Sequence, residues 1–210
     1  MAAPWNHNIH YHPLILAAVA PGSQRALDVG CGAGLLAREL SRRVPRVTAL
    51  DRDGPVLERA RREDAGAGVE YLQGDFLSHG FGPEPFDVIV SVAALHHMDP
   101  AAALARMRDL LRPGGVLAVV GLARGSLPAD LPRELVAAPA NLLLRARHRD
   151  WVQARAARAR GEAMAPVIWP PAHTYREISQ LAARLLPGVR YRRHLLWRYS
   201  LIWRKPAGWR

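Results

Sequence analysis

Short apolar runs alternate with segments of helical periodicity through the first 122 residues. Runs of this kind, which predict buried strands, lie near Leu27, at Val47 to Leu50, Val69 to Gln73, Phe86 to Val92 and Val116 to Leu122. Val47 to Leu50 and Val116 to Leu122 are apolar enough to be buried on both faces. Strands that alternate with helices predict a parallel sheet with right-handed crossovers, in which the first and fourth strand ends flank a ligand crevice.

The segments between these runs carry apolar residues at helical spacing. One predicted helix has its apolar face at Leu35, Leu36, Leu40 and Val44, and Pro45 ends it. Asp53 would cap a second helix that begins near Pro55, and Asp99-Pro100 would open a third that ends at Arg112-Pro-Gly-Gly115. Leu77 to Pro85 is rich in glycine and proline, so we expect a loop there.

The C-terminal region predicts one more helix and a pair of strands. Thr174 and Glu177 have the spacing of a capping box, and the helix that they open would run to Pro187-Gly188. Val189 to Leu196 and Tyr199 to Arg204 alternate as two strands around a turn near Trp197-Arg198.

The run from Leu27 to Gly34, Leu-Asp-Val-Gly-Cys-Gly-Ala-Gly, carries a strand into a glycine turn that opens a helix. Gly30, Gly32 and Gly34 lack Cβ atoms, so they allow positive φ and close approach of a ligand, whose space a side chain would fill. The turn therefore predicts a site for a nucleotide-like ligand. A plain tight turn remains an alternative, as does a dinucleotide site, because Gly32-x-Gly34-x-x-Ala37 matches a relaxed fingerprint.

Two carboxylates follow later strands. Asp51 ends the second strand, where an acidic residue can accept hydrogen bonds from both ribose hydroxyls of a nucleoside. Its alternative role is a helix cap, but Asp53 already supplies one. Asp75 and Phe76 follow the third strand, where Asp75 can accept from an adenine amine while Phe76, or Leu77, covers the ring; a bare turn is the alternative.

Composition narrows the class of protein. The chain has 210 residues, half of them hydrophobic, which suits one domain with a proper core. The net charge of +11 comes from arginine, since Lys205 is the only lysine, and the arginines are scattered. A basic surface could attract nucleic acid, but the pattern is only a weak pointer. Neither a signal peptide nor a membrane span is predicted, so we expect a cytoplasmic protein without membrane contact.

Cysteine and histidine usage argues against a metal centre. Cys31 is the only cysteine, which excludes an internal disulfide and a multi-cysteine zinc site. The histidines at positions 7, 10 and 12 fit no closed zinc pattern, so no metal is expected.

From Arg25 to Leu122 these motifs, taken in order, resemble the class I S-adenosylmethionine-dependent methyltransferases. Leu27 to Gly34 looks like the family's cofactor loop, Asp51 like its ribose acid, and Gly74-Asp75-Phe76 like its adenine contact. Leu111-Arg-Pro-Gly-Gly115 looks like its lead-in to the fifth strand. A dehydrogenase is disfavoured, because a nicotinamide fingerprint does not ask for Gly-Asp-Phe after the third strand.

The resemblance implies a fold and a cofactor. The expected fold class is α/β: a Rossmann-like, doubly wound, three-layer α/β/α domain with a seven-stranded, mainly parallel sheet and a C-terminal antiparallel hairpin. The implied cofactor is S-adenosyl-L-methionine, with Asp28 near its methionine end, unless Asp28 is buried for structural reasons. The expected cofactor-binding residues are Asp28, Gly30, Cys31, Gly32, Gly34, Asp51, Arg52, Asp75, Phe76 and Ser91.

The resemblance also implies a mechanism. A substrate nucleophile would attack the sulfonium methyl in one in-line displacement, so the protein's main task is to place the reactants. If the nucleophile is a hydroxyl or a protonated amine, a base helps, and His96 or His97 is the candidate because both follow the fourth strand. A packing role or a loop hydrogen bond is the alternative for either histidine.

We expect a single domain with four parts. These are an N-terminal flap or helix (1–24), a cofactor-binding core (25–122), a variable substrate wall (123–172), and the last helix with its hairpin (173–210). In the wall, arginines between Leu142 and Gly161 could meet a carboxylate, a phosphate or RNA, although a solvated helix face explains them as well.

The expected function is methyl transfer to an oxygen or nitrogen nucleophile of a small-molecule metabolite. The chain has no appended RNA-binding module, and the position after the fourth strand lacks an Asn-Pro-Pro-Tyr or Asp-Pro-Pro-Tyr motif. A nucleic-acid methyltransferase, supported only by the charge, remains an alternative, as does a non-methylating protein that binds the cofactor on the same fold.

Overall fold

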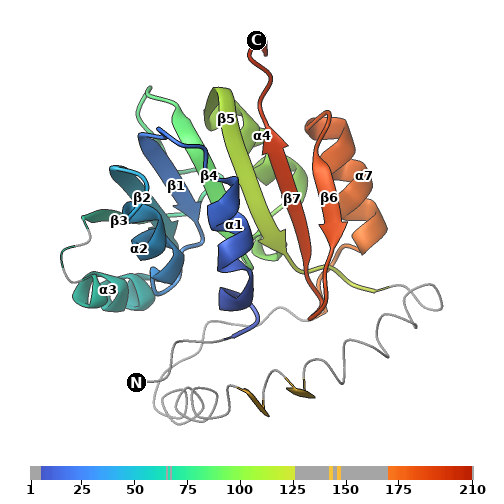
Figure 1. The fold of residues 1–210 in the computed structure, drawn as a ribbon, viewed down its shortest axis with the longest axis horizontal. Helices are drawn as coiled ribbons and strands as arrows, with labels where there is room; N and C mark the ends of the chain where they lie inside the picture. The colour runs from blue at the N-terminus through green and yellow to red at the C-terminus, as the bar shows by residue number, and fades with distance from the viewer. Residues whose placement is uncertain are drawn as a thin grey trace.

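The computed structural model describes residues 6–64, 66, 68–125, 142–143, 146–147 and 170–209. Within them one seven-stranded sheet has the strand order β3-β2-β1-β4-β5-β7-β6 (Figure 1). The strands are β1 (Arg25–Val29), β2 (Arg46–Asp51), β3 (Val69–Gln73), β4 (Phe86–Val92), β5 (Leu111–Gly121), β6 (Arg190–Arg193) and β7 (Tyr199–Arg204). The first five run parallel, and β7 pairs antiparallel with both β5 and β6.

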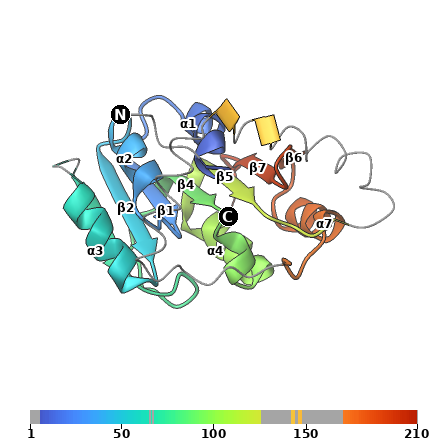
Figure 2. The same cartoon turned by 90° about the horizontal axis from the view of Figure 1, so that it is seen from below.

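Helices cover both faces of this sheet. They are η1 (Ile9–Tyr11), α1 (His12–Ala18), α2 (Leu35–Ser41), α3 (Gly54–Glu63), η2 (Leu95–His97), α4 (Pro100–Leu110) and α7 (Tyr175–Leu185). Buried residues of α1, α2 and α3 form one core cluster with the sheet, and those of α4 and α7 form another. Figure 2 shows α4 and α7 on the face opposite α1. The expected three-layer, mainly parallel α/β fold with its antiparallel C-terminal strands is therefore confirmed.

Strand periodicity explains the two cores. Successive side chains of a strand point to opposite faces of the sheet. In β4, Val88 and Val90 join the cluster on the α1 side, whereas Ile89 joins the cluster on the α4 side, and all three are buried. A central strand such as β4 is therefore apolar at most positions, which is the pattern that made it recognisable.

The order of the strands reverses at β1. This strand pairs with β2 on one side and with β4 on the other, both in parallel. In a doubly wound sheet a crevice opens beyond the carboxyl ends of the strands at such a switch point. The adjacency of the first and fourth strands is as predicted, and it puts the glycine turn after β1 beside the segment after β4.

Three helix starts match their predicted caps. The Asp53 side chain accepts the Val56 N–H, and the Asp99 side chain accepts the Ala102 N–H. Thr174 and Glu177 form the reciprocal capping box that opens α7. Each cap satisfies a backbone donor that the first helical turn leaves without a partner.

Two predicted strand boundaries are wrong. The strand β5 begins at Leu111 rather than Val116, because Leu111 already pairs with Phe86 of β4, and the stretch from Arg112 to Gly115 forms an irregularity before Val116 pairs with Val88. The strand β6 ends at Arg193 rather than Leu196. The chain leaves the extended conformation there, since Leu196 and Trp197 adopt φ values of 60° and 57°.

Most of the predicted substrate wall, including Trp151, Trp169 and the arginine-rich stretch from 145 to 160 apart from residues 146 and 147, lies outside the described residues. The same holds for residues 1–5 of the predicted N-terminal flap, Trp5 among them. The described part of that N-terminal segment contacts the main body. Ile15 of α1 is fully buried, and the Tyr11 hydroxyl donates to the carbonyl of Leu195.

Candidate functional site

The glycine turn after β1 is fixed to the end of β2. The backbone N–H groups of Gly30 and Cys31 both donate to the Leu50 carbonyl, at 2.8 and 3.1 Å. Gly30, Gly32 and Gly34 have φ values of 72°, 52° and 71°, which lie in the left-handed region that glycine adopts without strain. The backbone conformation therefore favours glycine at all three positions, as the sequence predicts.

The three glycines differ in what a side chain would meet. A Cβ atom on Gly30 would lie 2.2 Å from the Cβ of Ala94, and one on Gly34 would lie 2.6 Å from the Tyr71 hydroxyl. At Gly32 it would meet nothing within 4 Å. The expectation that all three glycines leave room for a ligand is thus corrected: protein packing forbids side chains at Gly30 and Gly34, and only Gly32 faces open space.

Asp51 joins the two turns that border this space. One of its carboxylate oxygens accepts the Gly32 N–H at 2.8 Å, and the other accepts the Asp53 N–H at 3.0 Å. A carboxylate oxygen can accept more than one hydrogen bond, so each retains capacity for a ligand hydroxyl. The side chain is half-buried. This arrangement fits the expected ribose-binding role, and it makes Asp51 a structural link between β2 and the turn as well.

Asp28 is a buried acid without a full set of partners. Its side chain is 2% exposed, and its Oδ2 atom has no hydrogen-bond partner. Burial raises the pKa of Asp28 to about 8, and the nearby negative charge of Asp51 adds to the rise. An orphaned carboxyl oxygen whose charge acts on Cys31 of the glycine turn is one that a ligand with a cationic or hydrogen-bonding group would complete. The residues therefore fit a cofactor that carries an amino group.

Cys31 contributes its backbone rather than a reactive thiol. Its Sγ atom lies 3.7 Å from the Gly32 carbonyl, and burial raises the pKa of the thiol. A thiol with a raised pKa stays protonated and is a weak nucleophile at neutral pH. Its predicted contact with the cofactor remains a prediction.

The predicted adenine-side residues occupy different environments. Asp75 is exposed, and one of its oxygens accepts the Leu77 N–H at 2.7 Å. Phe76 is 4% exposed and belongs to the core on the α4 side, where its ring centroid lies 6.1 Å from that of Phe81. Leu77 is half-buried, so of the two residues considered for covering a ring it is the more accessible.

Arg52 and Ser91, two further residues predicted to contact the cofactor, differ in how deeply they are buried. Arg52 is exposed at the end of β2. Ser91 is fully buried, and its hydroxyl donates to the Val29 carbonyl at 3.0 Å, which ties β4 to β1. A direct contact with the cofactor stays a prediction for each.

The two candidate bases lie in η2, immediately beyond β4. The turn that leads into η2 includes Ala93 at a φ of 55°. The rings of His96 and His97 have centroids 4.0 Å apart, and the Nδ1 atom of each is buried without a hydrogen-bond partner. Buried polar atoms are usually hydrogen-bonded, so two neighbouring orphaned nitrogens call for an explanation.

Both histidines are uncharged at neutral pH. Burial lowers the pKa of His96 to about 4, with smaller contributions from the charges of His97 and Arg198. Burial also lowers the pKa of His97, together with the charge of Arg52, while Asp51 opposes the change. A neutral imidazole can accept a proton, but a base with so low a pKa is weak.

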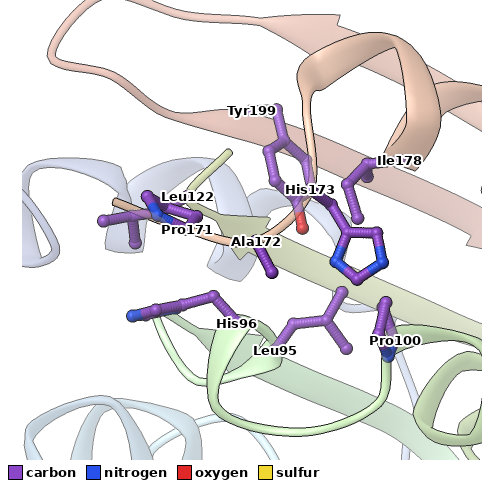
Figure 3. Close-up of a pocket in the computed structure, with 9 residues that line it drawn as sticks. All are labelled: Leu95, His96, Pro100, Leu122, Pro171, Ala172, His173, Ile178 and Tyr199. Atoms are coloured by element: carbon purple, nitrogen blue, oxygen red, sulfur yellow. The ribbon is translucent and has the colours of Figure 1, made fainter. Parts of the chain in front are cut away.

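His96 forms part of a recess between η2, the segment before α7, and β7. The recess is partly open to solvent and has a cavity volume of only about 10 Å³, and its lining is drawn in Figure 3. Its lining residues are Leu95, His96, Pro100, Leu122, Pro171, Ala172, His173, Ile178 and Tyr199. The Tyr199 hydroxyl points into it from β7, opposite Leu95 of η2 (Figure 3). Ligand pockets usually measure about 300–1,000 Å³, whereas this recess has room for about one water-sized group, so it would hold only the end of a molecule.

Sequence reasoning missed His173 and Tyr199. His173 precedes a helix cap and Tyr199 opens a strand, and neither belongs to a motif. The pairing of Tyr199 with Gly121 brings this residue to the carboxyl end of β5, a contact between distant parts of the chain.

In the described ranges, no three His, Cys, Asp or Glu side chains are grouped so as to hold a metal ion. Within those same ranges, no helix has both the length and the apolar character needed to span a bilayer.

Fold and site together define a Rossmann-like domain with a crevice at the switch point of its sheet, bordered by a glycine turn and an acidic strand end. Residues 27–119 match the methyltransferase domain family. The chain is 41% identical over 211 residues to an uncharacterized methyltransferase of Mycobacterium tuberculosis, and the match covers 99% of this chain and 100% of that protein. The chain therefore belongs to the class I S-adenosylmethionine-dependent methyltransferases, whose cofactor is S-adenosyl-L-methionine.

More distant relatives share the core or the fold. A ubiquinone biosynthesis O-methyltransferase of Serratia proteamaculans is 38% identical over 93 residues, which cover 42% of this chain and 39% of that protein. The N-methyltransferase NodS of Bradyrhizobium japonicum superposes with a TM-score of 0.61 over 94% of this chain and 96% of that chain. Its identity is 16%, so this likeness concerns the fold alone.

Proposed function

We propose that the protein transfers a methyl group from S-adenosyl-L-methionine to an oxygen or nitrogen nucleophile of a small-molecule metabolite. The observation that carries this proposal is the position of η2 between the glycine turn and the recess. On one side, Ala94 packs against Gly30, and the charge of Asp51 acts on His97. On the other side, Leu95 and His96 line the recess. A cofactor at the glycine turn and an acceptor in the recess would meet at this short helix.

The chemistry of the recess lining supports a small-molecule acceptor. The lining is mostly apolar, with the polar atoms of His96, His173 and Tyr199 as exceptions. Pockets that combine an apolar wall with a few polar groups are typical of small-molecule sites.

The proposed mechanism depends on placement. When bound, the cofactor supplies a sulfonium methyl group as the electrophile. Gly32 leaves room beside the turn, Asp51 accepts hydrogen bonds from hydroxyls, and the orphaned Asp28 oxygen accepts from an amino group. Holding two reactants in a productive geometry is worth about 7–11 kcal/mol in favourable cases.

Proton removal contributes less in this proposal. A well-placed general base typically accelerates a reaction by about 10²–10⁴-fold, and the effect is largest when its pKa lies near the operating pH. The pKa of His96 is about 4, so His96 would act at the lower end of that range. An acceptor that is already deprotonated, or one that loses its proton to water, would not need either histidine.

The test is incubation of the purified protein with S-adenosylmethionine that carries a labelled methyl group. One arm contains a small-molecule extract of cells and the other contains total RNA. We expect label on oxygen or nitrogen in the small-molecule arm, with S-adenosylhomocysteine formed in proportion. Asp51→Ala should lose both products.

A nucleic-acid acceptor is the second candidate, and the net charge of +11 is the observation that favours it. Label confined to RNA, with activity that falls steeply as salt is added, would support this candidate over the first. Cofactor binding without label in either arm would favour a non-methylating protein on the same fold.

A further inference from the structure

Arg198 stands at the same edge of the sheet as the cofactor crevice. It precedes Tyr199, which pairs with Gly121 at the carboxyl end of β5. The connection from β6 to β7 that carries Arg198 is closed by the His194 N–H, which donates to the Arg198 carbonyl at 2.8 Å. Before it, Leu196 and Trp197 both adopt positive φ, a conformation that side chains disfavour. Strain of this kind persists where the surrounding structure enforces it, and it is frequent at binding sites.

The guanidinium of Arg198 is buried and incompletely bonded. The residue is 7% exposed. Its Nη1 atom donates to the carbonyls of Leu196 and Trp197, at 3.1 and 3.4 Å, and its Nη2 atom donates to the Asn8 side chain at 2.8 Å. The Nε atom is buried and has no partner. Since an arginine offers five N–H donors, at least the Nε donor is left for another acceptor.

No negative charge of the described residues balances this cation. All three of its acceptors are neutral, and no described carboxylate forms an ion pair with it. Burial lowers the pKa of Arg198 to about 10, so the group keeps its charge at neutral pH. Arginine is almost never fully buried unless it is paired, because removal of a charge from water is costly.

The charge of Arg198 influences residues on the side where the methyl acceptor is expected to bind. It acts on His96, which lines the recess, and on the phenol groups of Tyr11 and Tyr175. Asn8 and Tyr11 come from the N-terminal segment, so that segment holds the guanidinium in place from one side while the strained connection holds it from the other.

We propose that Arg198 binds an oxyanion, a carboxylate or a phosphate group, of the methyl acceptor. This inference rests on the proposed function, and it narrows the substrate class to anionic small molecules. The free Nε donor of a fixed, planar guanidinium suits such a group, because arginine recognises carboxylate and phosphate through parallel hydrogen bonds. With its anion at Arg198, an acceptor would extend toward His96 and the methyl group.

The carboxylate of the cofactor is the competing partner for Arg198. The glycine turn follows β1, whereas Arg198 precedes β7, and β4 and β5 lie between these strands. Three strand spacings of about 4.8 Å separate them by roughly 14 Å. The methionine end of the cofactor is expected beside Asp28, on a different strand, and the titration with S-adenosylhomocysteine distinguishes the two partners.

The experiment measures the binding of simple anions by calorimetry, with and without S-adenosylhomocysteine. The probes are benzoate, inorganic phosphate, and uncharged benzamide as the control for benzoate. The variants are Arg198→Gln and Arg190→Gln, of which the second removes the same charge from an exposed position on the same hairpin. We expect benzoate or phosphate, but not benzamide, to bind the wild type. Arg198→Gln should weaken that binding by about tenfold or more, and Arg190→Gln should leave it unchanged.

The two anions distinguish a carboxylate acceptor from a phosphorylated one. The proposal is overturned if neither anion binds the wild type, or if Arg198→Gln binds them as tightly as the wild type does. It is also overturned if Arg198→Gln weakens the binding of S-adenosylhomocysteine as much as it weakens the binding of the anions, because the partner of Arg198 is then the cofactor. If the protein binds anions through Arg198 but does not bind S-adenosylhomocysteine, the anion site is supported and the proposed function is contradicted.

Arg198 also supports the hairpin, so Arg198→Gln could fail to fold, which circular dichroism would reveal. Arg198→Lys is the second variant for that case. This variant keeps the positive charge and loses the planar set of donors. It should therefore fold, and it should bind the anions several-fold more weakly than the wild type does. Wild-type anion affinity in a folded Arg198→Lys protein would contradict recognition by the guanidinium.

Discussion

The carboxylate of Asp51 accepts the backbone N–H of Gly32 at 2.8 Å. This hydrogen bond joins the last residue of β2 to the one glycine of the turn whose side-chain direction is open. Two motifs that lie 19 positions apart in the sequence thereby form the two sides of a single crevice. The bond also orients the carboxylate, so that its remaining lone pairs can meet a ligand without further ordering of the side chain.

The glycines should differ in their effect on stability. Gly30→Ala would put a Cβ atom 2.2 Å from Ala94, between two packed segments, so we expect a loss of several kcal/mol or failure to fold. In Gly32→Ala the new Cβ atom contacts no other atom, so only the positive φ is unfavourable, and it costs about 1–2 kcal/mol. Urea unfolding of both variants measures the difference. Equal losses would contradict the distinction between packing and open space.

Asp28 should make stability depend on pH. Its pKa is about 8 in the folded protein and about 3.8 when unfolded, so the folded state binds the proton more tightly. The stabilisation is fully present below about pH 4 and is lost progressively as the pH rises through about 8. Asp28→Asn cannot ionise, so its stability relative to the wild type should rise by a few kcal/mol between pH 5 and pH 8.

Urea unfolding of the wild type and Asp28→Asn at both pH values tests this. A difference that stays constant between the two would show that Asp28 titrates normally. Because the orphaned Oδ2 atom is the expected acceptor for the cofactor amino group, Asp28→Asn should also bind S-adenosylhomocysteine more weakly at pH 8, where the wild type gains a carboxylate.

The histidine pair should affect turnover and not cofactor affinity. We expect His96→Ala or His97→Ala to slow methyl transfer to the acceptor found by labelling, by about 10–100-fold, because general base catalysis contributes at least that much when it operates. Calorimetry with S-adenosylhomocysteine should give wild-type affinity for both variants. Unchanged turnover in both would remove the base hypothesis and leave placement alone to account for the rate.

Asn8 should stabilise the folded N-terminal segment. Its side-chain oxygen accepts from the buried Arg198, so Asn8→Ala leaves a second guanidinium donor without a partner. Such a loss costs about 1–3 kcal/mol in urea unfolding. Arg190→Gln, which changes an exposed residue of β6, is the control and should alter stability by less than about 0.5 kcal/mol. Equal stability of Asn8→Ala and the wild type would contradict the proposed anchoring.

Local patterns predicted much of this fold. The bounds of β3 and β4 follow directly from their apolar runs, and the caps at Asp53, Asp99 and Thr174 follow from short-range hydrogen bonding. The start of β5 could not be found in this way. Its first residues include a proline and two glycines of low strand propensity, which form an irregularity between the Leu111–Phe86 and Val116–Val88 pairs.

The candidate site was predictable only where it belongs to a motif. The glycine turn and Asp51 are read from their spacing, and the structure brings them together. Phe76 shows the limit of this reasoning, since an aromatic residue after a strand suits a ligand and a core equally well, and here it is buried in the core. The contact between Asn8 and Arg198 joins residues 190 positions apart, and no local sequence pattern predicts it.

The most direct test of the cofactor site is calorimetric titration of S-adenosylhomocysteine into the wild type, Asp51→Ala, Gly32→Val and Gly22→Val. Gly22 is the matched control, because it has a φ of 79° and open space around its side-chain direction, so valine there brings similar backbone strain away from the crevice. We predict micromolar binding by the wild type and Gly22→Val and its loss in the other two. Undiminished binding by folded Gly32→Val and Asp51→Ala would contradict the assignment of the crevice to the cofactor.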